Sequence, residues 1–220
     1  MNHCAFAGLF FGLSLTRGVL LSVLPLRALD LLGGAQQVSV LFFVVSLVGI
    51  TSALTQHLLI RILGSYHTFL IGIYSMALCA PLLAMEHPVG FVLGMFLHFF
   101  AIASIEVTSS LYVMHCVSRR ELGRFEPLRV LAVVAALSIG PFLGVWLSEE
   151  VSATLPYAIT AISALVTFIY FRSLGLHRTR LLESSRGAGN PFSVLKKFFA
   201  QPRLRLAWGL SVARSSWWVA

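Results

Sequence analysis

The stretch 89–116 reads VGFVLGMFLHFFAIASIEVTSSLYVMHC, and Glu106 is its one residue of the Asp, Glu, Lys or Arg type. A helix that crosses a bilayer needs about 20 predominantly apolar residues, and this stretch is longer than that. A charge near the middle of such a helix costs about 2.5 to 3.5 kcal/mol on insertion scales. The stretch therefore predicts a transmembrane helix that keeps one costly carboxylate.

The rest of the chain follows the same apolar pattern. Of its 220 residues 58% are hydrophobic and 11% are charged, whereas soluble domains carry about 25% charged residues. Five further apolar runs lie at about 5–29, 36–60, 68–85, 128–148 and 153–172, separated by short polar breaks. We predict an all-α polytopic membrane bundle of six transmembrane helices. The composition excludes a disordered chain, and three cysteines in or beside apolar runs do not make a disulfide framework.

The chain divides into three parts by composition. We expect a six-helix transmembrane domain at 1–172, a cytoplasmic linker loop at 173–205, and the truncated start of a seventh helix at 206–220. The last part is shorter than a membrane span requires. We therefore interpret the chain as a fragment, the first half of a larger membrane protein with an internal twofold repeat, each half being built from 3+3 helices.

The charges predict the orientation. The formal net charge is +8, from 16 Lys and Arg against 8 Asp and Glu. Basic residues gather in the breaks after the second and fourth runs and in the linker, whereas the opposite breaks contain Asp30, Glu86, Glu149 and Glu150. The positive-inside rule then predicts a multi-pass protein of the cell (inner) membrane with a cytoplasmic N-terminus. Because topology accounts for the basic residues, we expect no nucleic-acid partner.

Three ionisable residues lie too deep for their side chains to reach the membrane surface: Arg17, Glu106 and Arg214. At about 1.5 Å per residue they lie roughly 18, 15 and 12 Å from the cytoplasmic ends of their helices, within one layer. Such charges face a bundle interior or a water-filled path. We expect these three, with His98, to bind substrate and couple it to protons. In the alternative interpretation Arg17 and Glu106 form a permanent ion pair, and His98 is a hydrogen-bonded core histidine.

Glycines spaced four residues apart predict close helix packing within the bundle. The pairs are Gly8 with Gly12, Gly90 with Gly94, and Gly140 with Gly144. Pro141 lies inside the last of these and is expected to bend its helix, because it removes one backbone hydrogen bond.

Three segments carry a resemblance to a known family. Segment 57–67 contains Arg61 and Gly64, segment 118–129 is rich in charge, and Gly140-Pro141 is followed by Gly144. With the six runs and the basic linker, this pattern resembles the N-terminal half of a major facilitator superfamily transporter over nearly the whole chain. In the family's signature between helices 2 and 3, Gly64 matches a glycine, but Arg61 stands where an acidic residue is expected.

The other two segments extend the resemblance. The charged segment is similar to the family's loop between helices 4 and 5, and it implies a gate of ion pairs formed by Arg120, Glu121, Arg124 and Glu126. The elements at 140–144 resemble the Gly-Pro element of proton-coupled exporters in the family.

The resemblance implies a secondary active transporter of a small organic solute that works by alternating access, as a proton-coupled antiporter or efflux protein. The arginines on helices 1 and 7 also resemble those of organophosphate antiporters, so an organic-anion exchanger is an alternative. A non-transporting scaffold or receptor is another. The expected partners are the substrate, the proton, the bilayer and the missing C-terminal half, without which we expect no transport. The motifs of metalloproteases, serine hydrolases and nucleotide-binding enzymes are absent, so we expect neither enzyme activity nor a metal or cofactor.

Overall fold

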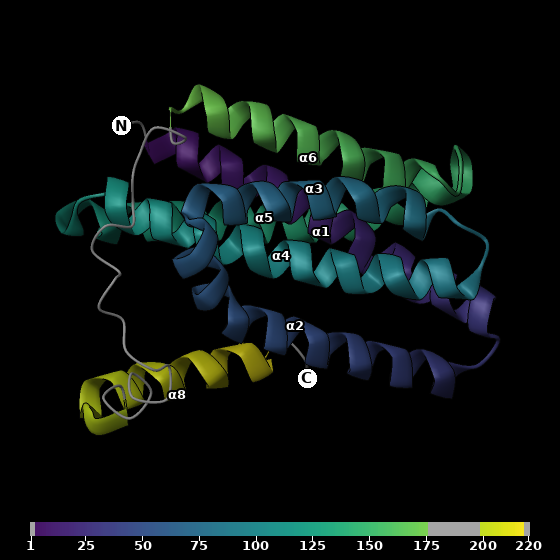
Figure 1. Ribbon diagram of the computed structural model, residues 1–220, viewed down its shortest axis with the longest axis horizontal. Coiled ribbons are helices and arrows are strands. Elements are labelled where there is room, and N and C mark those ends of the chain that lie inside the picture. The colour runs from purple at the N-terminus through teal and green to yellow at the C-terminus, as the bar shows by residue number, and fades with distance from the viewer. Residues whose placement is uncertain (1–2, 176–198, 218–220) are drawn as a thin grey trace. The chain divides into compact units, whose positions relative to one another are not determined.

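The computed structural model describes residues 3–175 and 199–217, and this part of the chain contains no strand (Figure 1). Six of its helices are long and apolar enough to cross a membrane. They are α1 (His3–Leu32), α2 (Ala35–Leu63), α3 (Ser65–Leu83), α4 (Pro88–Cys116), α5 (Arg119–Glu150) and α6 (Leu155–Ser173). The predicted all-α bundle with six membrane helices is confirmed.

Short turns connect these helices and force consecutive helices to run in opposite directions. Gly33 and Gly64 have φ of 73° and 87°, a left-handed conformation that glycine adopts without steric cost. The turn before α4 ends at His87, whose Nδ1 accepts a hydrogen bond from the Val89 amide at 3.2 Å. The N-terminus of α1, the α2–α3 and α4–α5 turns and the end of α6 therefore lie at one end of the bundle.

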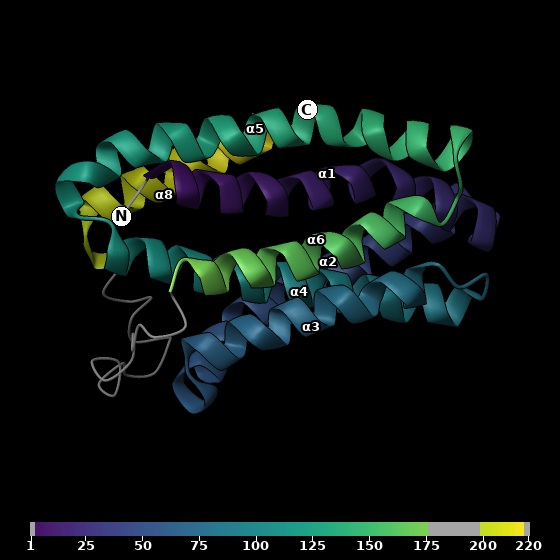
Figure 2. The same ribbon diagram turned by 90° about the horizontal axis from the view of Figure 1, so that it is seen from above.

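The helix contacts repeat after three helices. α1 packs mainly on α5 and also on α6, α4 packs on α3 and α2, and α3 meets α6 (Figure 2). If α1, α2 and α3 correspond to α4, α5 and α6, the contact of α1 with α5 corresponds to that of α4 with α2. The contact of α3 with α4 likewise corresponds to that of α6 with α1. Because α1 and α4 run in opposite directions, the contacts follow the expected 3+3 arrangement with inverted repeats.

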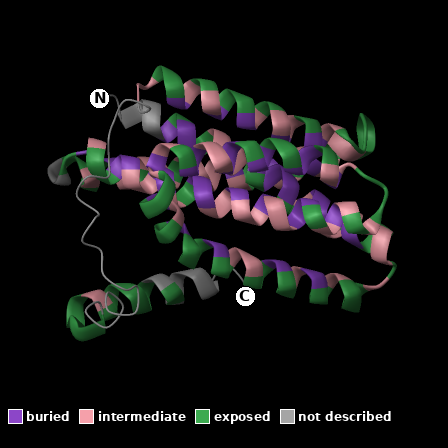
Figure 3. Cartoon of the chain, in the orientation of Figure 1, coloured by how far each residue is buried: buried purple, intermediate pink, exposed green. Residues whose placement is uncertain are grey.

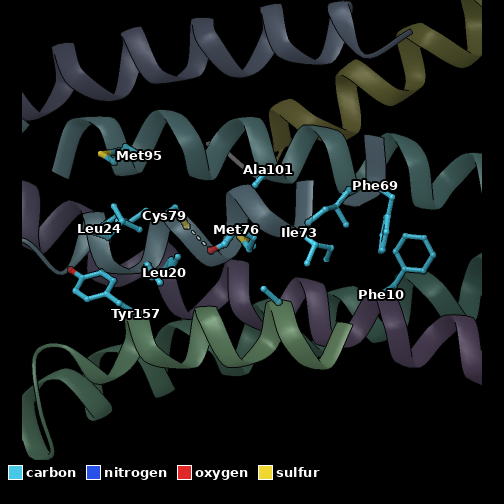
Figure 4. Close-up of a cluster of buried hydrophobic side chains, with 14 of the residues drawn as sticks. Phe10, Leu20, Leu24, Phe69, Ile73, Met76, Cys79, Met95, Ala101 and Tyr157 are labelled. Atoms are coloured by element: carbon cyan, nitrogen blue, oxygen red, sulfur yellow. Dashed lines mark hydrogen bonds between the residues drawn. The ribbon is translucent and has the colours of Figure 1, made fainter. Parts of the chain in front are cut away.

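The buried core lies where α1, α3, α4 and α6 meet. Its side chains include Leu20, Met76 and Met95 (Figure 4), and all three are at most 3% exposed. Figure 3 marks the buried positions along the helices. In lipid, such helices associate mainly through close packing and hydrogen bonds, because the surrounding acyl chains are just as apolar. Half of the apolar window of α3 is buried, against 17% in α2 and in α5. The latter two helices therefore flank the core.

The structure corrects the predicted start of the fifth helix. We expected it near residue 128 after a charged loop, but α5 begins at Arg119, directly after a turn at residues 117–118. Phe125 is fully buried, and its ring lies 6.5 Å from that of Phe10 on α1. Packing along one face thus keeps a polar segment helical, an effect that hydropathy alone does not register.

The glycine pairs differ in their roles. A Cβ added at Gly140 would lie 2.7 Å from Gly18 Cα, and one at Gly144 would meet the Val19 carbonyl oxygen, so α1 and α5 are in backbone contact there. The expected close packing at Gly8 and Gly12 is wrong. A Cβ at Gly12 would meet nothing within 4 Å, and one at Gly8 would be in ordinary contact with a tyrosine side chain. On α1 it is Gly18, outside the spaced pair, that lets the helices approach.

The chain forms two compact units, residues 1–181 and 182–220. The second contains α8 (Pro202–Trp217). We expected this helix to begin near residue 206, but it begins at Pro202, because a proline is favoured in the first turn, where its missing N–H has no intrahelical partner. The expected linker at 173–205 falls largely on residues 176–198, outside the described residues.

Candidate functional site

Arg17 of α1 and Glu106 of α4 form an ion pair on the surface of the six-helix unit. Arg17 Nη1 lies 3.6 Å from Glu106 Oε2, and the two side chains are 52% and 62% exposed. By helix rise, Arg17 is roughly 21 Å from the His3 end of α1 and Glu106 roughly 15 Å from the Cys116 end of α4. The structure thus brings together two of the residues singled out from the sequence.

Packing of α1 determines where Arg17 points. Thr16, on one side of it, is 1% exposed, donates a hydrogen bond to the Gly12 carbonyl at 3.1 Å and also bonds Ser163 of α6. Gly18, on the other side, lies against α5. Since α6 and α5 cover these two directions, the Arg17 side chain projects from the face that neither helix covers.

Glu106 is placed by the same kind of packing. Its neighbour Ile105 is 2% exposed and lies against Gly72 of α3, where an added Cβ would be 2.8 Å from Ile105 Cγ1. Thr108 is fully buried and donates its hydroxyl to the Ser104 carbonyl at 2.6 Å. These contacts direct one side of α4 into the core and leave Glu106 on the opposite side, together with Arg17.

An open groove of about 610 Å³ runs between α2 and α4 beside Glu106. Its walls include Ile50, Phe99 and Met114, and Ser110 supplies a hydroxyl. Of the described residues that line it, Glu106 is the only charged one, and Arg17 is not among them. The groove is therefore an apolar surface with one carboxylate among its described lining residues.

A buried amide links the two helices next to the groove. Gln56 of α2 is fully buried, and its Nε2 donates a hydrogen bond to Ser104 Oγ of α4 at 2.8 Å. The Gln56 Oε1 atom has no hydrogen-bond partner within the described residues. Sequence reasoning missed this residue, although an uncharged amide inside the apolar run 36–60 was a usable signal for an interhelical hydrogen bond.

His98 lies in the core. It is 2% exposed, its Nδ1 lies 3.9 Å from Cys79 Sγ of α3, and its ring meets the edge of the Phe99 ring at 5.9 Å. It does not line the groove. This placement corresponds to the alternative of a packed core histidine. On the same helix Ser110 lines the groove, whereas Ser109 is buried.

The residues expected at the cytoplasmic gate lie at one end of the bundle. Arg61, in the last turn of α2, and Arg124 of α5 are exposed. Gly64 makes the turn between α2 and α3 with its positive φ. The side chain of Arg120 lies outside the described residues.

The charge pair that the structure shows at this end lies within α5. Glu126 Oε2 is 3.0 Å from Arg129 Nη2, and the Arg129 guanidinium lies 5.1 Å from the centre of the Phe10 ring. Glu121 accepts a hydrogen bond from Ser118 Oγ at 2.6 Å, across the first turn of the helix. These contacts stabilise the start of α5 and dock it onto α1.

The Gly-Pro element of α5 contacts α1 directly. Ser22 Oγ donates a hydrogen bond to the Pro141 carbonyl at 2.9 Å, and Gly140 and Gly144 flank this point against Gly18 and Val19. The expected functional element is therefore also the place where these two helices approach most closely, within five residues of Arg17 along α1.

The remaining expected site residue, Arg214, belongs to α8 in the second unit. Its side chain lies outside the described residues. Of the three charges predicted to share one layer, the structure therefore describes the side chains of Arg17 and Glu106.

In the described part of the chain, no group of three His, Cys, Asp or Glu residues is arranged to hold a metal ion. Comparison of the chain with protein-family models, curated proteins and solved structures gives no match.

Proposed function

We propose that this chain is part of a secondary active transporter of a small organic solute, with the Arg17 and Glu106 pair at its substrate site. One observation carries the proposal: the pair lies at mid-depth of two apolar helices, on a face that the chain's own six membrane helices leave open. Ionisable residues within membrane spans face protein or water rather than acyl chains. A second bundle packed over this face would enclose a polar passage.

The inverted repeat supports the same proposal. In many secondary transporters, inverted three-helix repeats place the substrate near the midplane, and one bundle rocks against the other to expose it alternately to each side. Here α1 and α4 are the related helices, and each contributes one member of the ion pair. The basic end of the bundle faces the cytoplasm in this proposal, in keeping with the positive-inside rule.

The geometry of the pair suits exchange. The single 3.6 Å contact is longer than a hydrogen bond, so a proton or a charged solute that binds Glu106 has no hydrogen bond to Arg17 to break. This is the basis for proposing proton-coupled antiport.

Alternating access is testable without knowing the substrate. In a cysteine-free version of the full-length protein, Ser110→Cys places a thiol in the groove beside Glu106. We expect a membrane-impermeant maleimide to label it from either side of sealed vesicles. Leu165→Cys is the matched control, because that α6 position is 58% exposed on a helix that does not line the groove. Labelling of Ser110→Cys from one side only would refute alternating access.

Glu106→Gln tests the coupling. We expect the variant to fold and to lose flux driven by a pH gradient, while solute exchange without a gradient persists. If Glu106→Gln reduced stability and changed no flux, the pair would serve packing, as in a scaffold or receptor.

The exposed Arg17 guanidinium favours a second candidate, an organic-anion exchanger. Arginine binds carboxylates and phosphates through paired hydrogen bonds, and this side chain is 52% exposed. In that case Arg17→Gln would abolish flux and Glu106→Gln would not.

A further inference from the structure

We infer that the groove between α2 and α4 binds a lipophilic organic monocation, with Glu106 as its counter-charge. The inference rests on the proposed function, since it names the class of solute that the proposed substrate site takes. It depends on the shape of the groove, its single carboxylate and the position of Arg17 outside it.

Size and surface indicate a small organic molecule. The groove has a volume of about 610 Å³, within the range of about 300 to 1,000 Å³ that is usual for ligand pockets. Ile50 and Met114 provide aliphatic and thioether contacts, and Phe99 adds an aromatic ring. Aromatic faces attract organic cations, so the walls suit a large apolar ion better than a sugar or a polar amino acid.

The charge distribution selects the sign of the ligand. Glu106 is the only charged residue among the described ones that line the groove, so an anion in the groove would be repelled by the carboxylate that it approaches. The one described compensating charge on this carboxylate is Arg17, which reaches it from α1 through a single 3.6 Å contact. A cation in the groove approaches Glu106 from the α4 and α2 side and gains attraction that strengthens in an apolar surrounding. The sign of the lining charge therefore favours a cation over an anion.

The two repeats differ in whether the crossing of the related helices is closed or leaves a groove. The related crossing of α1 and α5 is closed, because Gly18 and Gly140 bring the two backbones together. At the α2 and α4 crossing, Phe99 lies beside Gly49, where an added Cβ would be 3.3 Å from the ring. The Phe99 ring packs on Gly49 at this crossing, and the open space extends along Ile50, Ala53 and Glu106.

Two ions of the same shape and opposite charge test the inference. Tetraphenylphosphonium is a permanent lipophilic cation, and tetraphenylborate is its anionic counterpart. We would measure binding of each radiolabelled ion to the purified full-length protein by scintillation proximity. We expect saturable binding of the cation and weaker binding of the anion.

Two variants separate charge recognition from loss of fold. Glu106→Gln is expected to weaken binding of the cation on the order of tenfold or more. Arg17→Gln is expected to strengthen it by a few-fold, because the carboxylate loses its competing partner. A variant that had merely misfolded would lose binding in both cases. Equal loss in both variants would overturn the inference, and so would tighter binding of tetraphenylborate or no saturable binding of either ion.

A matched pair of larger side chains tests the location. Ala53→Phe fills the groove and is expected to abolish binding of tetraphenylphosphonium. Ala77→Phe adds the same ring on an exposed position of α3 that does not line the groove, and it is expected to leave binding unchanged. If the two variants behaved alike, the site would lie elsewhere.

The binding result is independent of the labelling of Ser110→Cys. Labelling from both sides without cation binding would refute the ligand class and keep the transporter. Cation binding that depends on Glu106, with labelling from one side only, would keep the ligand class and refute alternating access.

Discussion

The contact between α1 and α5 makes a sharp stability prediction through Gly140→Ala. An added Cβ would lie 2.7 Å from both Gly18 Cα and Gly18 C and 2.9 Å from Val19 N. Ordinary contacts of a Cβ atom begin at 3.4 Å, so the helices would have to separate by about 0.7 Å. All three atoms are backbone, so no flexible side chain can give way.

The energetic cost follows from overpacking. Inserting an extra methyl group into a well-packed contact costs about 1 to 3 kcal/mol. Replacing glycine by alanine within a helix also gains up to about 1 kcal/mol of helix propensity. Gly12→Ala on α1 is the matched control, because its Cβ would meet nothing within 4 Å and it carries the same propensity gain. The difference in unfolding free energy between the two variants therefore measures the cost of the steric overlap at Gly140.

Equilibrium unfolding in mixed micelles, titrated with a denaturing detergent, measures that difference. We expect Gly140→Ala to be less stable than Gly12→Ala by about 1 to 3 kcal/mol. Because Gly18 follows Arg17 directly, we also expect the separation of the helices to alter labelling of Ser110→Cys. If Gly140→Ala were as stable as Gly12→Ala, the backbone contact between α1 and α5 would not exist as described.

Three further predictions concern the core. Ser104→Ala leaves the buried Gln56 Nε2 without its partner and should lower the free energy of unfolding by about 1 to 3 kcal/mol. The double variant Ser104→Ala with Gln56→Leu should recover part of this loss. A double variant no more stable than Ser104→Ala would contradict the hydrogen bond. Phe171→Ala removes a ring that is 1% exposed and stacked at 3.9 Å on Phe69, so its melting temperature in detergent should fall further than that of Phe142→Ala, whose ring is 70% exposed. The Tyr112 hydroxyl is buried without a hydrogen-bond partner within the described residues, so Tyr112→Phe should leave the melting temperature equal or raised, and a clear decrease would indicate a partner for that hydroxyl.

The ion pair also has a clear energetic meaning. Arg17 and Glu106 are joined by a single 3.6 Å contact that is longer than a hydrogen bond, whereas each of the two charges costs about 2.5 to 3.5 kcal/mol on insertion scales. An ion pair inside a membrane bundle is weak evidence for a stabilising role. A role in binding or coupling gives a reason for keeping two charges at this depth.

The charged segment 118–129 shows what a local average of hydropathy can predict. The average correctly placed a break after the fourth apolar run, but it assigned residues 119–127 to a loop, whereas they belong to α5. The fully buried Phe125 and the Arg129 guanidinium over Phe10 decide that these residues are helical. Such contacts join residues more than a hundred positions apart in the chain, and a local average of hydropathy does not contain them.

His98 and Gly12 illustrate the same limit within helices. We expected His98 to take part in binding and Gly12 to lie at a close helix contact. The direction each side chain takes depends on which neighbouring helix covers that face, and α3 covers His98 while no atom approaches the Cβ position of Gly12.

The sequence by itself determined that this is a membrane bundle of six helices, because the length and apolarity of each span follow from the thickness of the bilayer and from local composition. It also singled out Arg17 and Glu106, since a charge at that depth is costly wherever the helix packs. Only the tertiary structure decided that these two residues face each other, that α1 and α5 close through Gly18 and Gly140, and that α2 and α4 leave a groove beside Glu106. The physical reason is that helix rotation and spacing are set by side chains interlocking between distant segments, at distances of a few ångströms that no local pattern specifies.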